Sequence, residues 1–212
     1  MVNLFFGKRV KQFMNVDLFT QLCDTLKPRM SHSRFIHTLG VAYTAGALAM
    51  NYHYDNVDRA ILAGLMHDCA KGLSDDEKIA MCMDSGVMIS DAEYSNPGLL
   101  HAKAGAIIAE EEYWIHDEEI LNAIRSHTTG LPNMSMLQKI IFVADFIEPN
   151  RDDIIPYLDR IQELAFKDID LCVLEILERS LKYLEKKGRE IDPITKYTRD
   201  WYKKYIDERD SK

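Results

Sequence analysis

The chain has 212 residues, with 34 acidic and 26 basic side chains and a formal net charge of -8. A negative net charge repels nucleic acid and anionic membranes, so we expect neither as a partner. The longest apolar runs are shorter than the roughly 20 residues that span a bilayer, and the four cysteines form neither a C-x-x-C zinc motif nor a disulfide framework. We therefore predict a cytoplasmic protein with one domain over residues 1–212.

Two helices are predicted in the N-terminal half. Residues 35–52 are rich in glycine and alanine, small residues that let a neighbouring backbone approach closely. Acidic residues at 55–58 begin the second helix, whose apolar run 60–66 ends at the adjacent pair His67 and Asp68. A helix that is apolar on every face normally lies at the centre of a core. An unpaired carboxylate is costly there, so we expect a bound cation beside Asp68.

Capping boxes begin two helices in the middle of the chain, at residues 74–77 and 135–138. Gly86 ends the first of these helices and Pro149 ends the second. Two further helices are predicted between them, over residues 99–113 and 117–127.

The C-terminal part is also predicted to be helical. After Pro156 the sequence indicates one long amphipathic helix or a helix pair, which ends at Gly188. Trp201, Tyr202 and Tyr205 in the charged tail could dock as a last helix or form a homodimer contact. Because apolar positions recur every three or four residues along the chain, we predict an all-α fold, a single helical bundle with a long C-terminal helix.

Six ionisable residues fall on these helices or near their ends, and we consider them as metal ligands: His37, His67, Asp68, His101, His127 and Asp145. Asp145 lies four residues after Ile141 on an apolar stripe, although it could instead cap a helix or pair with an arginine. His37 shares a face with Val41, where a lone histidine is more often a hydrogen-bonded core residue. His127 alone could be a cation at a helix C-terminus. Their joint occurrence favours metal ligation.

The chemistry of such a set points to hydrolysis of a phosphate compound. Imidazole and carboxylate ligands without a thiolate suit iron, manganese or cobalt as well as zinc. A metal of this kind lowers the pKa of water to about 7 and polarises a phosphoryl oxygen. Lys71 and Arg151 follow the helices that carry ligands, and Thr128 offers a hydroxyl, so these three side chains could bind phosphate. The alternative for the two cations is ordinary complementation of the helix dipole.

Three histidines remain outside this set. His32, His53 and His116 lie in polar or turn-like settings, and we predict them at the surface.

Five local strings carry a resemblance to a known family. They are R-F-I-H-T-L-G-V from Arg34, H-D-C-A-K from His67, L-L-H-A-K from Leu99, H-T-T-G-L-P-N-M-S from His127 and A-D-F-I-E-P-N-R from Ala144. The ordered histidines and aspartates resemble the HD-domain metal-dependent phosphohydrolases. Within that superfamily the strings are similar to the YqeK family, the symmetrical diadenosine tetraphosphate hydrolases, over roughly residues 20–197.

The resemblance implies roles for individual residues. The metal, iron or a comparable divalent ion, would be held by four of them: His37, His67, Asp68 and Asp145. Water would attack the tetraphosphate centrally and release two ADP. Phosphate contacts would come from Lys71, His101, His127, Thr128 and Arg151. Asp68 would orient the nucleophile, and His101 or His127 would approach a second metal or protonate or stabilise the leaving phosphate.

The sequence departs from the family pattern at three places, and other functions are compatible with the same residues. The first twenty residues match nothing in the family, Gly72 stands where an acidic residue is usual, and residues 154–157 replace a more glycine-containing turn. The alternatives to the symmetrical hydrolase are a nucleotidase or phosphodiesterase acting on another nucleotide, and a non-catalytic nucleotide or metal sensor. In each case the partner is a small-molecule nucleotide or a metal.

Overall fold

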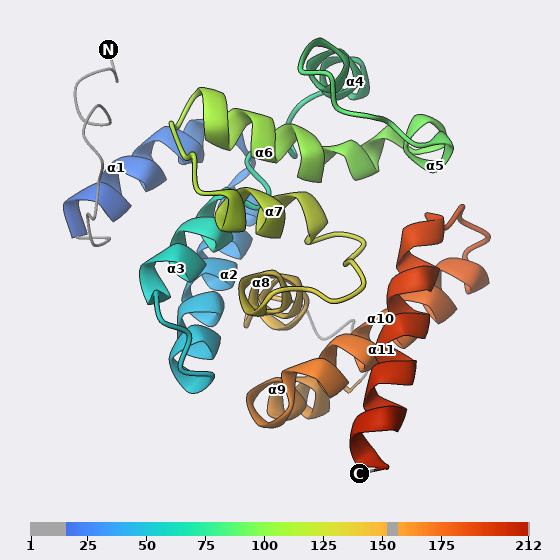
Figure 1. Cartoon of the computed structure of the whole chain (residues 1–212). Helices are drawn as coiled ribbons and strands as arrows, with labels where there is room; N and C mark the ends of the chain where they lie inside the picture. The colour runs from blue at the N-terminus through green and yellow to red at the C-terminus, as the bar shows by residue number, and fades with distance from the viewer. Residues whose placement is uncertain (1–15, 152–156, 212) are drawn as a thin grey trace.

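The computed structural model describes residues 16–151 and 157–211 (Figure 1). Within these ranges the chain forms eleven α-helices, two short 3-10 helices and no strand, which confirms the predicted all-α fold. In chain order the elements are α1 (Val16–Leu26), η1 (Lys27–Arg29), α2 (His32–Asn51), α3 (Val57–Met66), α4 (Asp75–Asp84), α5 (Asp91–Ser95), η2 (Pro97–Leu100), α6 (His101–Glu111), α7 (Glu118–Ser126), α8 (Met136–Ile147), α9 (Leu158–Lys167), α10 (Ile169–Lys186) and α11 (Pro193–Asp210).

Helix α8 forms the centre of the bundle. It packs against α2, α3, α7, α9 and α10, and it is seen nearly end-on in the middle of Figure 1. Its central position follows from its sequence, because apolar side chains cover most of its circumference. The ends of α3, α6 and α7 therefore meet beside the C-terminal end of α8.

Helices α2 and α3 approach each other closely. A Cβ atom at Gly64 would lie 2.8 Å from the Cα atom of Ala42, which is backbone that cannot move aside. Ala42 and Ala45 are fully buried at the same contact. The small residues that the sequence places on these helices thus allow the close packing that brings His37 and His67 side by side.

Several helix boundaries agree with the predicted signals. Both predicted capping boxes form, with the side chains of Ser74 and Ser135 accepting from backbone amides of the first turn. A third box at Ser90, which we did not predict, begins the short helix α5. Gly86 lies two residues after the end of α4, where the chain leaves the helix, and its φ of 68° is a conformation that glycine adopts without strain.

Other boundaries differ from the sequence-based expectation. Helices α1 and α5 were not predicted, and the helix expected over 99–113 begins only at His101, because Pro97 opens a separate 3-10 turn. Helix α3 ends at Met66, so His67 caps it and Asp68 lies in the turn that follows.

The C-terminal region contains the helix pair α9 and α10, followed by α11. The pair is separated at Asp168, whose side chain accepts from the backbone amide of Leu171 and caps α10. Helix α11 docks along α10, as predicted for the tail, with Tyr202 and Ile206 buried. The indole of Trp201 stacks on another ring of the same helix.

None of the helices in the described ranges combines the length and apolar character needed to cross a membrane. Fifteen of the first twenty residues, 1–15, and most of the unusual turn at 154–157 lie outside the described residues.

Candidate metal centre and phosphate site

The structure brings all six predicted ligand residues together from five helices. His37 lies within α2, His101 is the first residue of α6, and Asp145 lies in the last turn of α8. His67 and Asp68 directly follow α3, and His127 directly follows α7. Asp145 is half-buried, and the other five residues of the set are buried. By contrast, the three histidines predicted at the surface, His32, His53 and His116, are exposed.

Three of the histidines are oriented by nearby backbone carbonyls. Each ring donates from Nδ1 to the backbone carbonyl three residues earlier, because a carbonyl oxygen can only accept. The bonds are His67 to Gly64 at 2.7 Å, His101 to Gly98 at 2.6 Å and His127 to Ile124 at 2.7 Å. The Nδ1 position therefore carries the proton, and the lone pair of each Nε2 atom faces the centre of the cluster.

His37 is oriented differently, because it lies in the middle of α2, where backbone carbonyls are used by the helix. Its Nδ1 atom lies 3.0 Å from Oε1 of Glu148, a fully buried residue that caps α8. Its Nε2 atom lies 3.0 Å from Oδ1 of Asp145 and 3.3 Å from Nε2 of His67. Sequence analysis missed Glu148, whose position before Pro149 resembled an ordinary helix end.

Asp68 lies between two pairs of histidines. Its Oδ2 atom is 3.5 Å from Nε2 of His67 and 3.9 Å from Nε2 of His37. Its Oδ1 atom is 3.2 Å from Nε2 of His101 and 3.7 Å from Nε2 of His127. Among the described residues this buried Oδ1 atom has no hydrogen-bond donor.

The protonation states follow from burial and from these neighbours. Burial raises the pKa of Asp68, but His67 and the other imidazoles outweigh this effect and hold the pKa well below its usual range. The pKa of Asp145 is likewise lowered, because the adjacent His37, His67 and Arg151 outweigh burial. Burial lowers the pKa of His101 to about 4. Charged carboxylates and a neutral imidazole are the states that metal ligation requires.

The donor set fits a divalent cation. Imidazole lone pairs and carboxylate oxygens that face one another repel unless a cation lies between them. Three overlapping groups have ligand atoms within 4.8 Å of one another: His37, His67 and Asp68; His67, His127 and Asp145; Asp68, His101 and His127. The Oδ1 atom of Asp68, which accepts no hydrogen bond among the described residues, belongs to the last group. These residues could therefore hold a metal on either side of Asp68.

A cavity of about 270 Å³ opens above this cluster. The Asp68, His101 and His127 side chains in its lining are buried. Three cations of the lining are about one third exposed and so mark the mouth of the cavity. The lining residues are Arg34, Asp68, Lys71, His101, His127, Thr128, Phe142, Asp145, Phe146, Arg151, Ile176 and Ser180. The predicted phosphate-binding side chains thus line the same cavity as Asp68 and Asp145, two of the four predicted metal ligands.

The cations at the mouth contact the ligand cluster directly. Arg34 lies with Nη1 2.7 Å from Oδ2 of Asp68, and the Nζ atom of Lys71 lies 3.1 Å from Nε2 of His101. The hydroxyl of Thr128 lies 3.2 Å from the same His101 nitrogen. Sequence analysis missed Arg34, although its place three residues before His37, on the same helix face, is a signal that could have found it.

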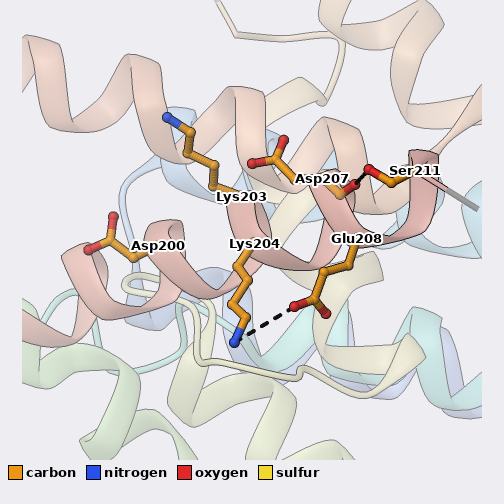
Figure 2. Close-up of a pocket in the computed structure, with 6 residues that line it drawn as sticks. All are labelled: Asp200, Lys203, Lys204, Asp207, Glu208 and Ser211. Carbon is orange, nitrogen blue, oxygen red and sulfur yellow. Dashed lines mark hydrogen bonds and ion pairs between the residues drawn. The ribbon is translucent and has the colours of Figure 1, made fainter.

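Another hollow lies on the outer face of α11 (Figure 2). The residues that line it come from α11 and from Ser211, which follows it, and they include cations such as Lys204 and anions such as Glu208, 3.7 Å away. The positive and negative charges of this hollow compensate one another, and its lining contains no histidine or cysteine. We therefore assign the chemistry to the cavity above Asp68.

Comparisons with known proteins agree with this geometry. The model of the HD domain family matches residues 34–150. The chain is 39% identical over 170 residues to the symmetrical bis(5'-nucleosyl)-tetraphosphatase of Halalkalibacterium halodurans, covering 80% of this chain and 89% of the relative. It is 36% identical over 176 residues to the protein of the same name from Bacillus subtilis, covering 83% and 92%.

A solved structure shows the same fold. The crystal structure of a predicted HD superfamily hydrolase involved in NAD metabolism, from Clostridium acetobutylicum, superposes with a TM-score of 0.85 at 36% identity. The match covers 88% of this chain and 97% of that protein. The identity, the coverage and the gathered histidines and aspartates together show that this chain belongs to the symmetrical bis(5'-nucleosyl)-tetraphosphatase family of HD-domain hydrolases.

Proposed function

We propose that the protein hydrolyses diadenosine tetraphosphate, and related dinucleoside polyphosphates, to two nucleoside diphosphates at a divalent metal centre. The observation that carries this proposal is the meeting of inward-facing imidazole nitrogens and two carboxylates at the base of a cavity whose mouth holds Arg34, Lys71 and Arg151. The names of the relatives support the choice of substrate.

The metal that we propose is iron, with manganese, cobalt and zinc compatible with the same ligands. His37, His67, Asp68 and Asp145 would hold it. The two oxygens of Asp68 face different histidine pairs, which supports a second metal between Asp68, His101 and His127. We therefore expect about two metal ions per chain, as in other two-metal phosphohydrolases.

When bound, the metal would supply an activated water and polarise the attacked phosphoryl group. The side chains of this protein would bind the substrate and orient the water. Arg34, Lys71 and Arg151 would bind the oxygens of the tetraphosphate, and Thr128 would donate its hydroxyl. Asp68 would orient the attacking water toward the central phosphorus.

The reaction would break the phosphorus–oxygen bond at the middle of the tetraphosphate. The oxygen of water bonds to one central phosphorus, and the bridging oxygen leaves with the other ADP. A terminal phosphate has a second pKa near 6, so ADP can leave as an anion without a proton donor. Because His101 and His127 donate their Nδ1 protons to carbonyls and turn their Nε2 lone pairs to the cluster, we assign them to holding the second metal rather than to protonating the leaving phosphate.

The test is anaerobic turnover of the iron(II)-loaded protein with diadenosine tetraphosphate, followed by ion-exchange separation of the products. Chelator-treated protein serves as the control. ADP as the sole product is the expected result. AMP together with ATP would contradict symmetrical cleavage, and absence of turnover in the metal-loaded protein would overturn the proposal in favour of another nucleotide substrate or a sensor.

A further inference from the structure

Among the four histidines of the cluster, His37 is the one whose Nδ1 atom is hydrogen-bonded to a carboxylate. The other three donate to carbonyls of their own chain segments. We propose that Glu148 is a positioning residue that holds His37 in its metal-binding tautomer and increases its electron donation, and that Gly40 provides the space for the Glu148 carboxylate. This inference rests on the proposed metal centre but not on the identity of the substrate.

The hydrogen bonds of Glu148 use both carboxylate oxygens. Oε1 accepts from Nδ1 of His37 at 3.0 Å. Oε2 accepts from the backbone amide of Asn150 at 2.7 Å and from its side-chain amide at 2.9 Å. Because both of its oxygens accept hydrogen bonds, the Glu148 carboxylate is fixed in place, and it therefore also fixes the orientation of the His37 ring.

The Glu148 carboxylate is also buried away from solvent. The described residues place no lysine or arginine within ion-pair distance of it. His37 is the basic side chain that the structure places within ion-pair distance of this buried carboxylate, and a buried negative charge needs such compensation. A metal on the far side of the His37 ring would balance this charge through the imidazole, as in the carboxylate–histidine–metal arrangements of other metalloproteins.

Gly40 makes this arrangement sterically possible. It lies three residues after His37 on the same face of α2, and a Cβ atom there would lie only 2.1 Å from Oε2 of Glu148. The same atom would lie 3.0 Å from Nδ2 of Asn150. Any side chain at position 40 would therefore displace the carboxylate from His37.

The turn that contains Glu148 also leads to the phosphate site. The backbone amide of Arg151 donates to the carbonyl of Glu148 at 3.0 Å. The Arg151 guanidinium then reaches Oδ1 of Asp145 at 2.7 Å. One short turn at the end of α8 thus supports a histidine ligand and a phosphate-binding cation together.

The first test compares Co²⁺ binding by wild-type protein and Glu148→Gln, with metal affinity measured by chelator competition and ligand geometry by the visible spectrum. Loss of such an outer carboxylate typically weakens metal binding about 10- to 100-fold, and we expect a loss in that range with a changed spectrum. Glu148→Asp, which keeps the charge, should restore part of the affinity. Wild-type affinity and spectrum in Glu148→Gln would overturn the proposal.

The second test changes no ionisable group. Gly40→Ala should reproduce the loss of Co²⁺ affinity, whereas Gly46→Ala, on the same helix, should not, because its Cβ would meet only flexible side chains such as Ile61. The double variant of Gly40→Ala with Glu148→Gln should bind no more weakly than the weaker single variant. Equal affinity in the two alanine variants would overturn the role of Gly40.

These measurements separate the inference from the proposed function. Co²⁺ affinity needs no nucleotide, so a wild-type protein that binds Co²⁺ but fails to cleave diadenosine tetraphosphate would contradict the proposed function alone. Thermal unfolding of the metal-free variants identifies misfolding. If Gly40→Ala does not fold, the Glu148→Gln result decides whether Glu148 positions His37.

Discussion

The guanidinium of Arg151 lies 2.7 Å from Oδ1 of Asp145, so a cation at the mouth of the cavity touches a carboxylate of the candidate metal centre. A second bond, from Nε of Arg151 to the carbonyl of Asp145 at 2.9 Å, fixes the same side chain. Phosphate binding and metal binding are therefore joined at the last turn of α8.

Replacing Arg151 by alanine should weaken substrate binding while leaving the metal in place. A hydrogen bond to a charged group is worth about 1.5–3 kcal/mol, so we expect KM to rise about 10- to 100-fold. Steady-state kinetics and elemental analysis measure the two effects. Arg125→Ala is the matched control, because that arginine is about as exposed, at 34% against 35%, but pairs with Glu118 away from the cavity. An unchanged KM in Arg151→Ala would contradict the phosphate-binding role.

Replacing Asp145 by alanine should remove bound metal and turnover together. Its carboxylate faces Nε2 of His37 and of His67, at 3.0 and 3.7 Å, and alanine offers no ligand atom in its place. Metal retained after gel filtration and the rate of substrate hydrolysis are the two measurements. Full metal content with full activity would show that Asp145 is not a ligand.

Gly64→Ala should destabilise the protein even without metal. The added Cβ would meet the backbone of Ala42 at 2.8 Å, and such overpacking costs about 1–3 kcal/mol. For a protein of this size that corresponds to a fall in Tm of about 2–12 °C. Thermal unfolding of metal-free protein provides the measurement, with Gly46→Ala as the control. Equal Tm values in the two variants would show that the α2–α3 contact adapts.

The ion pair between Arg209 and Asp168 should give a pH-dependent contribution to stability. Burial raises the pKa of Asp168, but the hydrogen bonds from Arg209 and from the amide of Leu171 outweigh it, so the pKa lies below its ordinary value. A lowered folded-state pKa stabilises the fold above the unfolded-state pKa of about 3.9, and this contribution is lost as the pH falls through the folded-state value.

Arg209→Gln should therefore lower the free energy of unfolding at pH 7 by less than about 1 kcal/mol, since the pair is partly exposed. The difference from wild type should shrink below about pH 4. Urea unfolding across pH measures it, with Arg199→Gln as the control, because the partner of Arg199 among the described residues is its exposed neighbour Asp200 on the same helix. A difference that does not change with pH would contradict the assignment.

Much of the fold was predictable because helix signals are local. Each of the capping boxes, at Ser74 and at Ser135, spans only four residues of sequence, and the structure forms both. The 3-10 turn before His101 and the cap at Asp168 were less predictable, because competing turn and helix signals overlap there. The close contact at Gly64 could not be predicted, since it depends on which helix crosses α3.

The sequence by itself determined the all-α class and the residue types that meet at the site, because helix periodicity, caps and ligand chemistry depend on side chains that are close in the chain. Only the tertiary structure decided that Asp68 divides two histidine pairs and that Glu148 holds His37, 111 residues earlier. Such contacts depend on how the helices pack around α8, and a local pattern carries no information about the partner that a distant segment brings.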